Sequence, residues 1–268
     1  MPDPLRPETS RPVPFRGGGF HYVPRRAAPW IGFALAIALW QGLSSAGIIS
    51  PLFLPSPHAI ASALWDLTES GALLSHLGWS LQRILIGWAI GTACGLAIGL
   101  AMGIFSMARS VGLPFVSALF PIPKIALLPL LILWFGIGEP SKVAVIALGV
   151  FFPTVISAYN ACDAVPRNLI RMGQSFGLPG ATIVREILLP GAMPGILSGF
   201  RITASIALIL VVAAEMIGAQ HGLGALILSA GNLMQTDQLV AGVVVLSILG
   251  LLISMALGRI ESWVLRWR

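Results

Sequence analysis

The sequence predicts an all-α integral membrane protein with about six transmembrane helices. Of its 268 residues, 56% are hydrophobic and only 10% are charged, and its mean hydropathy is +0.90. Soluble domains carry about 25% charged residues, so a chain this apolar has to be covered by lipid. Its apolar residues form continuous runs of about 20, the length that a helix needs to cross a bilayer. Continuous rather than alternating runs favour helices over a barrel.

The predicted spans are the six apolar runs 30–49, 84–105, 113–137, 143–162, 191–218 and 239–257. Prolines at 121, 123 and 129 predict that the third span is broken. Residues 1–27, rich in Pro, Arg and Gly, are expected to form a disordered tail. The membrane domain is therefore expected to occupy 28–268. Within this domain, on the outer side of the membrane, Ser56-Pro57 and Gly71 predict the two ends of a short amphipathic surface helix.

The positive charges predict which side of the membrane each loop faces. Arginines gather before the first span, after the last one and in the loop 163–190, whereas residues 50–80 contain no Lys or Arg. The positive-inside rule places both termini and the loop 163–190 in the cytoplasm of a bacterial inner-membrane protein. This bias also accounts for the net charge of +6. Because the arginines form no continuous basic face, nucleic-acid binding is not expected.

The sequence carries no pattern typical of catalysis or of bound cofactors. Its four histidines form no His-Glu-x-x-His motif, and no Gly-x-Ser-x-Gly motif occurs. Cys94 and Cys162 have no metal-site spacing. Neither Lys124 nor Lys142 completes a phosphate-binding loop. We therefore expect no catalytic residue, no metal and no cofactor in this chain, and an energy source in another protein.

Five glycines of the second span recur at every fourth position. Four residues advance a helix by about 400°, so the glycines form one nearly straight stripe where another helix can approach closely. The sequence leaves open whether that helix belongs to the same subunit or to a second one. The stripe consists of Gly87, Gly91, Gly95, Gly99 and Gly103.

Three charged residues fall in or near spans, where an ionisable group is costly, and they are candidates for a translocation pathway. Lys124 lies among prolines; it could line an anion pathway, or snorkel from a span that begins later. Glu215 could act in gating, or pair with a charge on a neighbouring helix. Arg201 lies fourteen residues before Glu215, about 21 Å along a helix, so the two cannot pair. The glycine-rich loop after Glu215 is predicted to be flexible or tightly turned.

The cytoplasmic loop 163–190 is predicted to be ordered. Pro166 can open a helix, apolar residues follow it at helical spacing, and Gly177 breaks that helix. A second short amphipathic stretch follows, and Pro190 is expected to start the return into the bilayer. Two short helices joined at a glycine would form a protruding knob.

This loop resembles the signature of the binding-protein-dependent transport permeases, the membrane subunits of type I ATP-binding-cassette (ABC) importers. The signature is Glu-Ala-Ala, three residues, Gly, nine residues, then Ile-x-Leu-Pro. Gly177 is followed after nine residues by Ile187, Leu189 and Pro190, whereas residues 171–173 read Arg-Met-Gly in place of Glu-Ala-Ala. The stretches 54–57, 80–83, 123–130, 134–138 and 214–224 resemble the branch that serves nitrate, sulfonate and taurine.

The resemblance implies that the segment from Gly177 to Ile187 couples to a separate ATPase. Leu178, Ile183 and Val184 would be its apolar plug and Arg185 a rim charge. It also implies two ATPase subunits that bind ATP and Mg²⁺, a second copy of this chain, and a periplasmic binding protein that hands over a small, anionic nutrient. An ion-driven transporter or a channel is the alternative, but such proteins often show repeats and paired acidic residues. This chain has a single Glu215 in its spans and no visible repeat.

Overall fold

The structure is a computed structural model that describes residues 28–267, so the predicted tail 1–27 lies outside it. Within the described residues every regular element is a helix, as the predicted fold class requires. The chain divides into two units, 1–58 and 59–268, which are described separately.

The first unit contains α1 (Ala28–Ser45), which covers most of the first predicted span. Its apolar side chains are largely exposed, Trp30 by 76% and Phe33 by 65%. The Gln41 side chain accepts a hydrogen bond of 3.2 Å from the His58 amide. Because α1 is not among the described helices long and apolar enough to cross a membrane, the first span stays a prediction.

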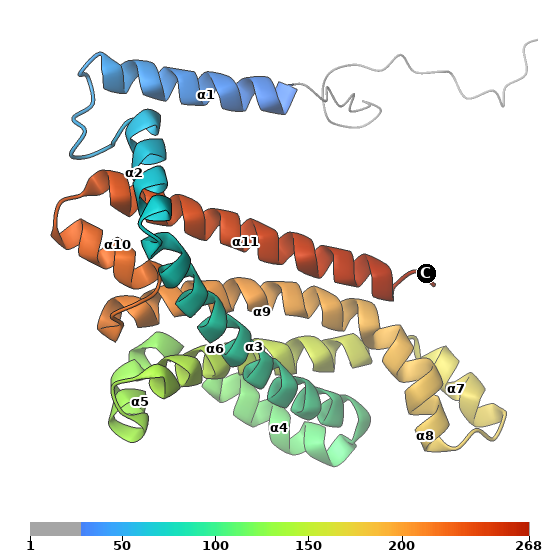
Figure 1. Ribbon diagram of the computed structural model, residues 1–268. Coiled ribbons are helices and arrows are strands. Elements are labelled where there is room, and N and C mark those ends of the chain that lie inside the picture. The colour runs from blue at the N-terminus through green and yellow to red at the C-terminus, as the bar shows by residue number, and fades with distance from the viewer. Residues whose placement is uncertain (1–27, 268) are drawn as a thin grey trace, which may run out of the picture. The chain divides into compact units, whose positions relative to one another are not determined.

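The second unit contains the helices that meet this requirement (Figure 1). They are α3 (Ala72–Ile104), α6 (Glu139–Asp163), α11 (Thr236–Val264) and the continuous run 180–218. A fifth span is possible where α4 (Ser106–Leu119) is followed by η1 (Lys124–Leu127) and α5 (Leu128–Phe135), with a bend of 85° between them. The described residues thus support four or five spans and do not confirm the predicted count of six. The predicted surface helix is present as α2 (Pro57–Glu69).

The glycine stripe of α3 packs against α6 of the same chain. A Cβ built on Gly91 would collide with the backbone carbonyl of Ala147, and one on Gly99 would lie 2.6 Å from the Val155 carbonyl oxygen. At the far end, a Cβ on Gly103 would lie 2.6 Å from the Cβ of Cys162. The two backbones therefore touch along most of α3, which decides between the two predicted alternatives in favour of packing within the subunit.

Helix α6 forms the centre of the second unit. Over half of its apolar stretch, 56%, is buried, against 17% for α11. One face of α6 meets α3, and another meets α9 (Leu189–Gly218). The fully buried Val145, Ile146 and Val150 of α6 pack with Ala207 and Val211 of α9. Because α6 packs against both α3 and α9, its first residues help to position the side chains at one end of the bundle, and its last residues help to position those at the other end.

Lys124 closes the bend in the broken span. Its ammonium group donates to the carbonyl oxygens of Leu119 (2.6 Å), Phe120 (3.2 Å) and Ile122 (2.7 Å), and lies 4.6 Å from the centre of the Phe152 ring. These three bonds use every N–H of the ammonium group and satisfy carbonyls at the end of α4. No donor is left for a passing anion, so the geometry differs from the predicted pathway role.

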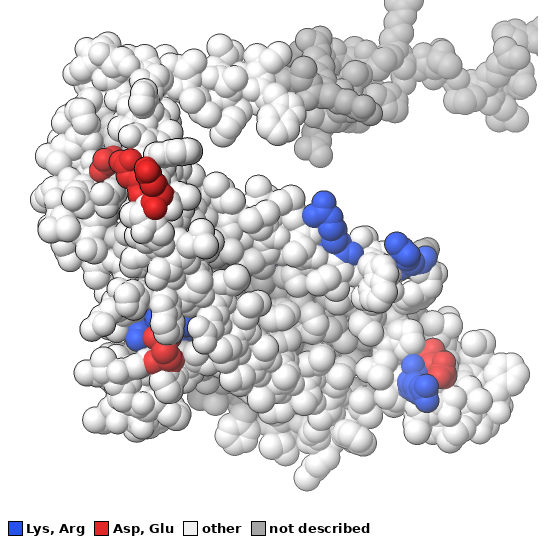
Figure 2. All heavy atoms as spheres, viewed as in Figure 1, with Lys and Arg blue, Asp and Glu red and all other residues white. Residues whose placement is uncertain are grey.

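Charged side chains are sparse on the surface. On the face drawn in Figure 2 they form a few small groups, one acidic group over α2 and the others toward the ends of the long helices, and the middle of that face carries no charge. An uncharged belt between charged ends is the distribution expected where hydrocarbon surrounds the helices.

Candidate functional site

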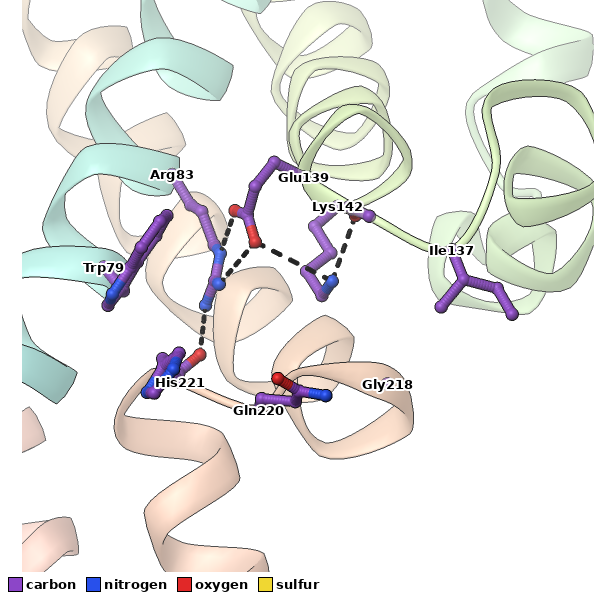
Figure 3. A pocket seen from close by; sticks show the side chains of 9 residues that line it. Trp79, Arg83, Ile137, Glu139, Lys142, Gly218, Gln220 and His221 are labelled. Atoms are coloured by element: carbon purple, nitrogen blue, oxygen red, sulfur yellow. Dashed lines mark hydrogen bonds and ion pairs between the residues drawn. The ribbon is translucent and has the colours of Figure 1, made fainter.

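A buried ion network joins α3, α6 and α9 at one end of the bundle (Figure 3). Its centre is Arg83, whose side chain is only 3% exposed. The guanidinium donates to both carboxylate oxygens of Glu139, at 2.5 and 2.7 Å. It also donates to Glu215 at 2.7 Å and to the carbonyl oxygen of His221 at 2.6 Å. Breaking such a buried pair by removing one partner costs about 3–5 kcal/mol, so the network fixes three helix ends to one another.

Glu215 is buried with its carboxylate fully engaged. It accepts hydrogen bonds from the Ser80 hydroxyl at 2.8 Å and from the Gly224 amide at 2.8 Å, besides the one from Arg83. A Cβ on Gly222 would overlap the Glu215 carboxylate, and Gly222 has φ +129°. Both the missing side chain and the backbone conformation therefore require glycine at this position.

The loop after Glu215 was predicted to be flexible or tightly turned. Residues 219–222 make a tight turn, and the chain then continues as α10 (Leu223–Asn232), a helix that was not predicted. The Leu223 amide donates to the Ser80 hydroxyl at 2.8 Å, and His76 Nδ1 lies 3.0 Å from the Gly222 amide nitrogen. These contacts attach the turn to α3, and no local sequence pattern indicated them.

A cavity of about 270 Å³ lies beside the network and is partly open. The Trp79 and His221 rings stack in its wall with centroids 6.0 Å apart. Lys142, whose side chain is 6% exposed, donates to the Gly138 carbonyl at 3.0 Å, and its Nζ lies 4.0 Å from Glu139 Oε1. The cavity is lined by Trp79, Arg83, Ile137, Gly138, Glu139, Lys142, Gly218, Gln220 and His221 (Figure 3).

The structure does not bring the three predicted pathway residues together. Glu215 pairs with Arg83 on a neighbouring helix, which is the second of the two roles predicted for it. Arg201 forms an ion pair with Glu261 of α11, and Lys124 caps α4. Arg83 itself was expected to precede a span beginning at residue 84, yet α3 begins at Ala72 and Arg83 is buried within it. The helix is longer than its uncharged stretch because the buried arginine is bonded to the carboxylates of Glu139 and Glu215.

The predicted knob lies at the opposite end of α6 and α9 (Figure 1). Helix α7 (Arg167–Ser175) begins after Pro166. Gly177, which has φ +70°, follows two residues after the end of the helix and terminates it. The Gly177 amide donates to the Gln174 carbonyl at 2.9 Å, and the Leu178 amide donates to the Gly173 carbonyl at 3.1 Å. This pair of bonds is the Schellman motif, in which a glycine in the left-handed region ends a helix.

The second helix of the knob continues directly into the membrane span. It begins as α8 (Gly180–Ile183), passes through the π-helical segment η2 (Val184–Leu188) and becomes α9. Pro190 therefore lies within a continuous run and does not begin a separate helix. The Leu189 amide bonds to the Val184 carbonyl, five residues earlier. The π turn replaces the usual hydrogen bond over four residues with one over five, directly before Pro190, which has no backbone N–H to donate.

The apolar residues of the knob face in two directions. Ile183 is 8% exposed and packs against Gly173 of α7, and Val184 packs against the cluster where the knob joins α6 and α9. Ile183 and Val184 therefore point into the chain, whereas the predicted apolar plug would point out toward the ATPase. Arg185 is exposed as expected, beside Glu186, whereas Ile187 and Leu189 are half-buried. The apolar side chains that point outward are Leu169, Met172, Phe176 and Leu178, exposed by 40%, 51%, 77% and 39%.

The knob is anchored to the spans by a separate apolar cluster. Val165, Leu188 and Ala192 pack with Ala158 and Ala161 of α6, all less than a tenth exposed. Movement of the knob therefore acts directly on α6 and α9. Within the described residues no group of three or more His, Cys, Asp or Glu side chains could hold a metal ion.

Comparison with known proteins assigns the chain to a family. Residues 91–267 match the model of the binding-protein-dependent transport system inner membrane component. The chain is 39% identical over 242 residues to the putative aliphatic sulfonates transport permease protein SsuC of Escherichia coli, covering 90% of this chain and 92% of the relative. It is 36% identical to the E. coli taurine transport system permease protein TauC, with 87% of each chain covered.

Solved structures show the same fold. An inward-facing structure of the MetNI methionine ABC transporter matches with a TM-score of 0.59 and 26% identity, over 69% of this chain and 92% of that one. A second crystal form, 24% identical, matches with a TM-score of 0.60 over 79% of this chain. These likenesses support an ABC importer over the ion-driven alternative. The chain belongs to the binding-protein-dependent transport system inner membrane components, the permease subunits of ABC importers.

Proposed function

We propose that this permease passes a small aliphatic sulfonate, of the taurine or alkanesulfonate class, from a periplasmic binding protein to the cytoplasm. The proposed substrate class comes from the relatives, since those at 39% and 36% identity are named for aliphatic sulfonates and taurine. Both similarities extend over nearly nine tenths of this chain. Selectivity in this family rests largely with the binding protein, so this subunit has to pass what it is handed.

The exposed apolar side chains of the knob are the observation that supports the proposed mechanism. Its four outward apolar side chains lie on α7 and the following turn, outside the long spans. Apolar side chains gathered on a protruding element indicate a surface that a partner covers. The proposed partner is a cytoplasmic ATPase with a groove that takes Phe176 and Leu178. Two such subunits, each bound to ATP and Mg²⁺, would serve two copies of this chain.

Closure of the ATPases would then move the knob, and the knob would move the spans. The inner face of the knob packs on α6, and its second helix is continuous with α9. In this proposal both termini and the knob lie in the cytoplasm, the ion network lies at the periplasmic end, residues 28–268 form the membrane domain, and residues 1–27 form a tail. The positive-inside rule supports this orientation.

Co-purification and uptake test the proposal together. The chain would be tagged at its carboxyl end, produced with its ATPase and binding protein, and extracted in mild detergent. Gly177→Val forces a β-branched residue into a left-handed conformation and should distort the turn before Leu178. Gly180→Ala is the matched control, because a Cβ there meets nothing within 4 Å and Gly180 has a helical backbone.

We expect the ATPase to co-purify with the wild type and with Gly180→Ala, and to be lost or weakened with Gly177→Val. ATP-dependent uptake of labelled taurine or ethanesulfonate should follow the same order. Recovery of the ATPase with all three forms at equal yield would contradict the assignment of the knob. Absence of any sulfonate uptake by the wild type would contradict the proposed substrate class.

A further inference from the structure

The cavity beside the ion network has the features of a binding site that no contact within the chain fills. We propose that it is a subsite for a small zwitterion carrying an ammonium and a sulfonate group, received at the periplasmic end of the permease. This inference rests on the proposed function and specifies the form of substrate that the permease itself recognises.

The cavity wall contains a buried cation that is incompletely bonded. The ammonium group of Lys142 has three N–H donors, and among the described residues it makes one hydrogen bond, to Gly138. Glu139 Oε1, at 4.0 Å, is beyond hydrogen-bond distance. The side chain is nevertheless 94% buried, as its 6% exposure shows. A buried ammonium with unused donors at a cavity wall is costly, and an anionic ligand would satisfy it.

The charged side chains around the cavity balance one another. Arg83 and Lys142 are positive, and Glu139 and Glu215 are negative, so the local charge sums to zero. A zwitterion keeps this sum at zero, whereas a simple anion adds an unbalanced negative charge beside two carboxylates. Glu139 is also available to an ammonium group. Its side chain is 44% exposed, and a carboxylate has more acceptor positions than the two N–H groups of Arg83 occupy.

The size and lining of the cavity fit a small ligand. Its volume of about 270 Å³ lies below the range of about 300–1,000 Å³ typical of drug-sized ligands. The Trp79 ring offers an apolar wall for a short carbon chain, and the Gln220 amide is a further polar group on the lining (Figure 3). A two-carbon aminosulfonate has the required size, with opposite charges at its two ends.

Equilibrium binding to the assembled permease–ATPase complex in lipid nanodiscs, without binding protein, tests the inference. The probes are taurine and ethanesulfonate, which share the sulfonate but differ in the ammonium group. We expect saturable binding of taurine, at least about tenfold tighter than that of ethanesulfonate, as expected for one lost hydrogen bond between charged groups.

Two variants alter the site in different ways. Lys142→Met removes the buried ammonium, and Gln220→Glu adds a negative charge to the cavity lining, which should repel a sulfonate. Gln220 lies on an exposed segment, so this second variant does not depend on tolerance of a core substitution. Gln235→Glu is the control, because Gln235 is exposed near the same end of the bundle but does not line the cavity. Both site variants should weaken taurine binding at least about tenfold, and the control should leave it unchanged.

Uptake by the complete transporter separates the two proposals. If the wild type takes up taurine but its permease complex shows no saturable binding, or binds taurine and ethanesulfonate equally, the subsite is wrong and the proposed function stands. Unchanged taurine binding in Lys142→Met and Gln220→Glu would equally overturn the subsite. If the wild type takes up no sulfonate at all, the proposed function itself fails.

Discussion

The two ends of the bundle depart from the usual distribution of side chains in opposite ways. At one end, the buried Arg83 and Glu215 and the half-buried Glu139 are bonded to one another. At the other end, four apolar groups of the knob stand exposed. Arg83 and its two carboxylates have their partners within the chain, whereas the exposed apolar groups have none among the described residues. The ion network is thus bonded within the chain, with only Lys142 beside it keeping unused donors, and the second end awaits another protein.

The largest effect is expected from Arg83→Met, which leaves the buried Glu215 and the half-buried Glu139 without their shared partner. Loss of about 3–5 kcal/mol of stability is expected, measured as a lower melting temperature of the purified protein in detergent. Arg185→Met is the control, since the Arg185 side chain is 85% exposed. Combining Arg83→Met with Glu215→Met and Glu139→Met should recover part of the loss, because apolar replacement of a whole buried network is far less costly. No recovery in the triple variant would show that the arginine acts through packing rather than charge.

Packing of α3 on α6 should give the next largest effect. Gly91→Ala places a methyl group against the Ala147 backbone and should cost about 1–3 kcal/mol by overpacking. Gly78→Ala, on the same helix, meets nothing within 4 Å and is the matched control. Thermal melting of both variants checks this. Equal melting temperatures would mean that the two helices separate more easily than their contacts indicate.

At the knob, substitution should change assembly rather than folding. Phe176→Ser removes the most exposed apolar side chain of α7 and its turn, 77% exposed. We expect about tenfold weaker binding of the ATPase, or about 1–2 kcal/mol as for a moderately important interface residue. The melting temperature of the permease alone should stay the same. A titration of ATPase against both forms measures the first quantity, and a lowered melting temperature would place Phe176 in the fold instead.

The smallest effect is expected at an exposed ion pair. Arg109 and Asp163 lie 3.3 Å apart, but their side chains are 46% and 45% exposed. Arg109→Gln should therefore change stability by no more than about 1 kcal/mol, although Arg109 also lies 5.0 Å from the Tyr159 ring centre. Melting in low and high salt checks this. A loss as large as that of Arg83→Met would contradict the distinction between buried and exposed pairs.

Local patterns allowed much of the fold to be predicted. Five of the six predicted spans correspond to helices long enough to cross a membrane, or to the broken pair, because hydropathy is summed over neighbouring residues. Gly177 marked the end of α7 because a left-handed residue at a helix end favours glycine. The spacing of the glycines predicted a close helix contact, and only the structure could identify α6 as the partner.

The ion network could not be predicted from local patterns. Arg83 lies 56 residues from Glu139 and 132 residues from Glu215, and a single sequence contains no signal that joins them. The arginine was interpreted as the boundary of a span, since a lone charge ordinarily ends an apolar run. The direction of Ile183 was missed for a related reason, because helical spacing shows which residues share a face but not which neighbour covers it.

The position of Arg83 in the chain also has a consequence for biosynthesis. The ribosome makes Arg83 before either carboxylate that it binds. At about 5–20 residues per second, Glu139 follows about 3–11 seconds later and Glu215 about 7–26 seconds later, over separations of 56 and 132 residues. During that interval the helix that enters the bilayer earliest in this unit carries an unmatched cation. The bonds that bury Arg83 can form only after α6 and then α9 have been made, so the final environment of an early residue depends on late helices.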